Sequence, residues 1–115
     1  NYEKSLPIMF ETLRRDFILG IQILKVSGNG NINAIADTIN KYVVEDGIVH
    51  IDAIGIKATY MTVKALIQAV EYLVSKGYRF NLRPYYVKVN TAGNDIQPIS
   101  KTAIRWTLIA KEKSI

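Results

Sequence analysis

Hydrophobic and polar residues change their spacing several times along the 115-residue chain, and each change predicts a new element. Apolar residues three and four positions apart, typical of helices, occupy residues 5–16, 31–45 and 58–76. Alternating or continuous apolar runs, typical of strands, occupy residues 21–27, 48–54, 79–89 and 101–110. Glycines lie between most of these segments, as expected at turns and helix ends. The predicted order is one helix followed by βαβαββ.

This order predicts an α/β domain of the two-layer α+β kind, in which a mixed four-stranded sheet carries two helices on one face. Strands joined through a helix should run parallel, and the last two strands should form an antiparallel hairpin. The stretch TAGNDIQP, residues 91–98, is the polar tip of that hairpin. We expect residues 21–115 to form this single domain and residues 1–20 to form a short helical extension.

Each main helix is expected to bury one apolar stripe against the sheet. In the first helix the stripe consists of Ile32, Ile35, Ala36, Ile39 and Val43. In the second helix it consists of Val63, Leu66, Ile67, Val70 and Val74. In the hairpin, the expected core residues are Phe80, Leu82 and Tyr86 on one strand and Ile104, Trp106 and Leu108 on the other.

Composition narrows the class of protein. The chain is 49% hydrophobic and 22% charged, as in globular proteins, and no apolar run approaches the roughly 18 residues of a membrane span. The start NYEK does not resemble a signal peptide. There is no cysteine, which excludes disulfides, thiol catalysis and cysteine-bound metals. We expect an intracellular protein without a membrane partner, in the cytoplasm or nucleoid of a prokaryote or the nucleus or cytoplasm of a eukaryote.

Positive charge is concentrated in the last third of the sequence. The formal net charge is +5, and residues 76–115 alone carry eight basic and two acidic side chains. A localised basic surface favours a polyanionic partner such as DNA or RNA. The alternative is a surface whose charge serves solubility.

The glycine loop Ser27, Gly28, Asn29, Gly30 and Asn31 follows the first predicted strand and precedes a helix. It lacks the third glycine of a dinucleotide fingerprint and the Lys-Ser or Lys-Thr of a P-loop, so we expect no nucleotide cofactor. Its backbone N–H groups and the helix N-terminus are nevertheless suited to a phosphate of a nucleic acid. The alternative interpretation is that Asn31 only caps the helix.

Catalytic residues are sparse. His50 and Asp52 lie on one face of the same predicted strand and are either a base with its orienting acid or, as we expect, a structural hydrogen-bonding pair. One histidine without cysteines makes a zinc site improbable. We expect neither an enzyme nor a metal protein.

The predicted hairpin carries basic and aromatic residues on the face opposite its core residues. They are Arg79, Arg83, Tyr85, Lys101 and Arg105, accompanied by Val87 and Thr107, and Lys88 lies near the tip. Arginine and lysine neutralise phosphates, and a tyrosine can stack on an unpaired base. The alternative is a solvated hairpin, and for Tyr86 we expect packing in the core.

Several stretches resemble the stage V sporulation protein S family: ILKVS at 23–27, IDAIGIKATYMTVKA at 51–65, Pro84, and TAI at 102–104. That family resembles the larger Alba-like group, whose βαβαββ architecture is shared by the C-terminal domain of translation initiation factor three. The resemblance implies a small, usually dimeric nucleic-acid-binding protein without enzymatic activity. It also implies binding through the loop 27–31, the turn 55–57 and the span 83–105.

These observations lead to one main hypothesis and one alternative. The main hypothesis is a protein that binds DNA or RNA through backbone phosphates with weak sequence specificity, in a chromatin, nucleoid, RNA-associated or regulatory role. Its charged contacts would be Arg83, Lys88, Lys101 and Arg105, with Lys57 and the glycine loop as a second contact. The alternative is a module that assembles with itself or another protein through the face of Ile23, Tyr85 and Val87.

Overall fold

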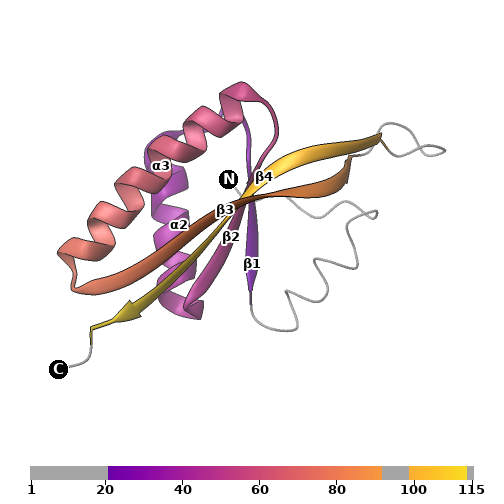
Figure 1. Ribbon diagram of the computed structural model, residues 1–115. Helices are drawn as coiled ribbons and strands as arrows, with labels where there is room; N and C mark the ends of the chain where they lie inside the picture. The colour runs from indigo at the N-terminus through magenta and orange to yellow at the C-terminus, as the bar shows by residue number, and fades with distance from the viewer. Residues whose placement is uncertain (1–20, 92–98, 114–115) are drawn as a thin grey trace.

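The computed structural model describes residues 21–91 and 99–113, so the predicted helix at 5–16 lies outside the described residues (Figure 1). The described elements are β1 (Gln22–Val26), α2 (Ile32–Asp46), β2 (Ile48–Ala53), α3 (Ile56–Ser75), β3 (Tyr78–Thr91) and β4 (Ile99–Glu112). The predicted order βαβαββ is confirmed. Neither α2 nor α3 is long and apolar enough to cross a membrane.

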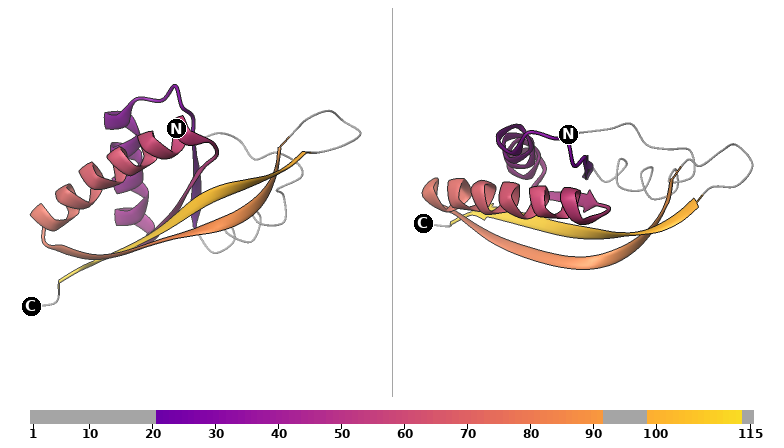
Figure 2. Two further views of the ribbon diagram at one scale, coloured as in Figure 1. Left: turned by 45° about the horizontal axis from the view of Figure 1, so that its top comes forward. Right: turned by 90° about the horizontal axis from the view of Figure 1, so that it is seen from above.

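The sheet has the strand order β1-β2-β4-β3. β1 and β2 are parallel, and β4 is antiparallel to both of its neighbours, β2 and β3. Both α2 and α3 cover the same face of this sheet, and within residues 21–91 and 99–113 no helix covers the other face (Figures 1 and 2). The two-layer arrangement with a mixed four-stranded sheet is therefore confirmed.

The core lies between the helices and one face of the sheet. From the sheet, Leu24, Ile51 and Leu108 are fully buried in it. The stripe predicted for the first helix is confirmed, because Ile35, Ala36, Ile39 and Val43 of α2 are all buried. Gly47 ends α2 in the left-handed conformation, with φ of 81°, which an L side chain adopts only with strain.

The stripe predicted for the second helix is only partly confirmed, because Leu66 is buried and Val70 packs partly buried against the core, but the other three residues do not pack there. The buried residues of α3 are Ala58, Thr62, Ala65, Leu66, Ala69 and Leu73. Val63, Ile67 and Val74, which were predicted to face the core, are exposed. α3 carries two apolar stripes, and the stripe with three alanines lies against the sheet because small side chains let a helix approach it closely.

The strands β3 and β4 form a hairpin that continues well past the ends of both helices (Figures 1 and 2). Tyr86 pairs with Ile104 of β4 and is 77% exposed, so its predicted packing in the core is wrong. It lies on the helix side of the sheet, where it lines a groove together with Ile56 and Tyr60 of α3. β3 is an edge strand with Pro84 in its middle.

Candidate nucleic-acid interface

Three connecting segments lie at one end of the sheet, because β1, β2 and β3 all run in the same direction. They are the loop between β1 and α2, the turn between β2 and α3, and the outer part of the hairpin. These are the segments for which the sequence predicts contacts with nucleic acid. The topology thus brings residues from distant parts of the sequence to one end of the molecule.

Hydrogen bonds within the glycine loop fix its shape. The N–H of Gly30 donates to the carbonyl oxygen of Ser27 at 3.0 Å, and the N–H of Asn29 donates to the Ser27 hydroxyl at 3.1 Å. Oδ1 of Asn31 accepts a bond of 3.0 Å from the N–H of Ala34, so Asn31 caps α2. Ser27 and Asn31 therefore support the loop, while Asn29 is exposed and faces solvent.

Gly28 lies directly against the side chain of Lys57, in the first turn of α3. A Cβ atom at Gly28 would lie 3.1 Å from Cγ of Lys57 and 3.2 Å from its Cβ. Any larger residue would push the lysine aside, so glycine allows the loop and Lys57 to share one surface. Gly55 precedes the first residue of α3 and has no side chain to cap the helix. Because Lys57 lies in the first turn, it adds its charge to the positive end of the helix dipole.

The hairpin continues this surface. Thr102 of β4 and Tyr86 of β3 line the same groove as Gly55 and Ile56, at the start of α3. Nζ of Lys88 donates a 2.8 Å hydrogen bond to Oγ1 of Thr102. Lys88 is thereby held on the helix side of the hairpin, near the beginning of the helix that carries Lys57.

The other predicted basic contacts lie on the opposite face of the hairpin. Arg83 and Lys101 are exposed on the face that the helices do not cover. The guanidinium carbon of Arg83 lies 4.8 Å from the ring centroid of Tyr85, a cation–π contact that orders the arginine. The projecting part of the hairpin therefore presents Lys88 on one face and Lys101 on the other. Arg83 lies on the same face as Lys101 but within the body of the sheet, in register with Thr107 of β4.

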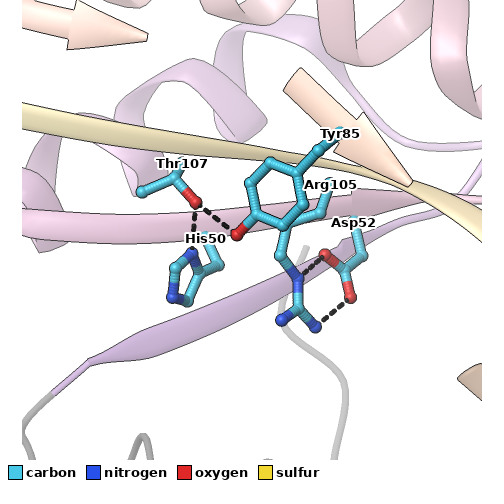
Figure 3. Close-up of polar contacts among 5 residues, drawn as sticks. All are labelled: His50, Asp52, Tyr85, Arg105 and Thr107. Carbon is cyan, nitrogen blue, oxygen red and sulfur yellow. Dashed lines mark hydrogen bonds and ion pairs between the residues drawn. The ribbon is translucent and has the colours of Figure 1, made fainter. Parts of the chain in front are cut away.

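Arg105 is in a different environment from these three residues. Its Nε donates to Oδ1 of Asp52 at 2.7 Å, and its NH2 group donates to Oδ2 at 2.8 Å (Figure 3). Arg105 is 8% exposed and Asp52 is 4% exposed. Strand alternation correctly predicts the face on which Arg105 lies. Because its guanidinium is buried and paired with Asp52, we assign Arg105 to the support of the sheet and not to the contact with nucleic acid.

A second polar group lies beside this ion pair. Oγ1 of Thr107 lies 2.8 Å from Nδ1 of His50 and 2.7 Å from the hydroxyl of Tyr85 (Figure 3). Because a hydroxyl carries one proton, Thr107 donates at most one of these bonds and accepts the other. His50 and Asp52 thus bond to β4, each with its own partner: Thr107 and Arg105. These hydrogen bonds join β2 to β4 across the face that α2 and α3 do not cover.

The fold and this surface define a small α+β domain with a basic, projecting hairpin. The profile of the family described as Stage V sporulation protein S (SpoVS) matches residues 22–111, and the chain belongs to this family. The resemblance seen in the sequence is thereby confirmed. Membership fits a small regulatory protein of sporulation.

Other comparisons add little. No curated protein sequence matches the chain significantly. Among solved structures, the chain is similar to precorrin-6y C5,15-methyltransferase from Geobacter metallireducens GS-15, with a TM-score of 0.38 and 17% sequence identity. The match covers 82% of this chain and 44% of the methyltransferase chain, so this chain spans less than half the length of that protein.

Proposed function

We propose that the chain binds DNA or RNA through backbone phosphates and with weak sequence specificity. The observation that carries the proposal is the meeting of the glycine loop, Lys57 and the basic hairpin at one end of the sheet. Phosphate contacts position a protein on a nucleic acid without reading its bases, which is why we expect weak specificity.

The hairpin supplies the principal contact. A two-stranded ribbon is narrow enough to enter the major groove of a duplex, where phosphates line both sides. In this proposal Lys88 on one face of the ribbon and Lys101 on the other reach phosphates on the two sides of the groove, and Arg83 adds a basic side chain nearer the body of the sheet. Lys57 and the exposed Asn29 provide a second contact beside the ribbon. For a family member, such binding suits a regulatory role in sporulation.

Binding should depend steeply on salt. If three to five phosphates are neutralised per chain, log affinity should fall with log salt concentration at a slope of about −3 to −5. The measurement is a titration of labelled duplex DNA and of single-stranded RNA of equal length at several salt concentrations. Failure to bind either ligand at low salt would contradict the proposed function.

Reversing the hairpin charges should abolish most of this binding. The variant Arg83→Glu with Lys101→Glu should stay folded, because both side chains are exposed, and should lose at least about tenfold in affinity and show a shallower salt slope. A matched control is Arg79→Glu with Lys111→Glu, a pair of exposed residues opposite each other at the far end of the hairpin. Equal loss in both variants would show that net charge, and not the position of the charges along the hairpin, governs binding.

A second candidate function is a protein interaction module. The face proposed for it from the sequence is poorly suited, because Ile23 is buried and Tyr85 and Val87 are half-buried. The large exposed apolar residues of the described chain concentrate instead on α3.

A further inference from the structure

The sheet face that α2 and α3 do not cover contains residues that are almost fully buried. Ile23 of β1 is 2% exposed, although β1 is an edge strand and Ile23 alternates with Leu24, which faces the helices. On the same face, Asp52 of β2 and Arg105 of β4 are buried as well. An uncovered face of a sheet is normally in contact with water, so a further layer covers this part of the sheet.

This buried area reaches across the strands but does not include the whole face. Ala103 of β4 is fully buried, and Val87, its partner on β3, is half-buried. Arg83 and Lys101 lie on the same face and are exposed. The covering layer therefore lies mainly over β1, β2 and β4, and these two basic side chains remain in contact with solvent.

The sequence of residues 1–20 is suited to form this layer. Their apolar side chains recur at helical spacing and form one stripe, which consists of Leu6, Met9, Phe10, Leu13 and Phe17. The segment leads directly into β1, the strand of Ile23, which begins at Gln22. A helix over residues 5–16 would be about 18 Å long, enough to cross the roughly 14 Å between the first and last strands of a four-stranded sheet.

The other segments outside the described residues are less suited to cover Ile23. Residues 92–98 join the outer ends of β3 and β4, whereas β1 lies at the opposite edge of the sheet. Residues 114–115 are only two positions long. Length, apolar pattern and connection to β1 thus all favour residues 1–20.

We propose that residues 1–20 fold back onto the sheet face opposite α2 and α3 and bury their apolar stripe against Ile23 and its neighbours. The domain then has three layers, with the sheet in the middle. The same packing keeps water away from the ion pair of Asp52 and Arg105, which strengthens their attraction. The family profile begins at residue 22, so this layer lies outside the matched region. The proposal does not depend on nucleic-acid binding, and it makes this face unavailable to a protein partner.

The first test uses the absence of cysteine from the chain. In Ile23→Cys the thiol should react slowly with a water-soluble thiol reagent, and adding Leu13→Asp within the stripe should raise the rate at least about tenfold by opening the cover. Arg15→Asp is the matched control, because helical spacing places Arg15 on the side away from the stripe, and it should leave the rate unchanged. Leu24→Cys, on the helix side of β1, should stay protected beside Leu13→Asp and so report an intact core.

Two results of this test would overturn the proposal. One is an Ile23→Cys thiol that already reacts rapidly in the otherwise unchanged chain. The other is an Ile23→Cys thiol that reacts equally slowly with and without Leu13→Asp while Leu24→Cys stays protected.

The second test leaves the stripe intact and decides the matter if Leu13→Asp unfolds the whole domain. A nitroxide attached to Arg15→Cys should weaken the NMR amide signals of Ile23 and Asp52 much more than that of Lys64, which is exposed on α3. In a mixture of isotope-labelled chains without nitroxide and nitroxide-bearing chains without isotope, these signals should keep their intensity. Equal effects on Ile23 and Lys64 would overturn the proposal. Weakening of Ile23 in the mixture would also overturn it, because the segment of a second copy would then cover the face.

Discussion

Replacing Asp52 by alanine should lower the free energy of unfolding by about 3–5 kcal/mol, because it removes one partner of a buried ion pair. Arg105 would lose both of its hydrogen bonds to the carboxylate, and its guanidinium would remain buried on the sheet without a charged partner at Asp52. Urea unfolding followed by circular dichroism should show a lower midpoint with an unchanged slope.

Two further variants make this prediction specific. Asp37→Ala removes an exposed carboxylate of α2 and should change stability by no more than about 0.5 kcal/mol. Combining Asp52→Leu with Arg105→Met replaces the whole ion pair by apolar side chains. This double variant should regain most of the lost free energy of unfolding, because it leaves no buried charge without a partner. If Asp52→Ala costs no more than Asp37→Ala, the ion pair does not support the fold.

Leu73→Ala should cost about 2–5 kcal/mol, because Leu73 is completely buried and its removal leaves a cavity between α3 and the sheet. Val74→Ala, one residue further along the same helix, should lower the free energy of unfolding by no more than about 0.5 kcal/mol. The reasons are that the Val74 side chain is exposed and that alanine has a higher helix propensity than valine. Both should be measured by urea unfolding followed by circular dichroism.

This comparison also tests the orientation of α3. The sequence pattern predicts that Val74 faces the core, whereas the structure places Leu73 there. A larger loss for Val74→Ala than for Leu73→Ala would mean that the helix is rotated toward the predicted orientation.

The elements and their directions could be predicted because local signals define them. Gly47 and Gly77 mark the ends of the two helices, and alternation marks β2 as a strand with one buried face. A helix between two strands then requires parallel directions, which the structure confirms for β1 and β2.

The orientation of α3 could not be predicted, because the helix has two regular apolar stripes. Counting large apolar side chains favours the stripe of Val63, Ile67 and Val74. The sheet instead receives the stripe of Ala65, Ala69 and Leu73, whose small members allow close approach. Which stripe packs inside depends on the distance between layers, and that distance is a property of the whole fold.

The environment of Arg105 was also beyond the sequence pattern. Alternation within β4 predicts its face, but its burial depends on the residue opposite it in the neighbouring strand. Asp52 is that residue only because β4 inserts between β2 and β3 in a particular register. The position of the glycine loop and the hairpin could be predicted without the strand register, because strand direction alone places them at one end of the sheet.

Pro84 has a consequence for how the protein avoids aggregation. A long edge strand such as β3 exposes backbone N–H and C=O groups that can template an additional strand from another molecule. Proline lacks the N–H, and the nearby charges of Arg79, Arg83 and Lys88 repel a second identical edge. A hairpin can therefore project far from the body without growing into a sheet shared between molecules.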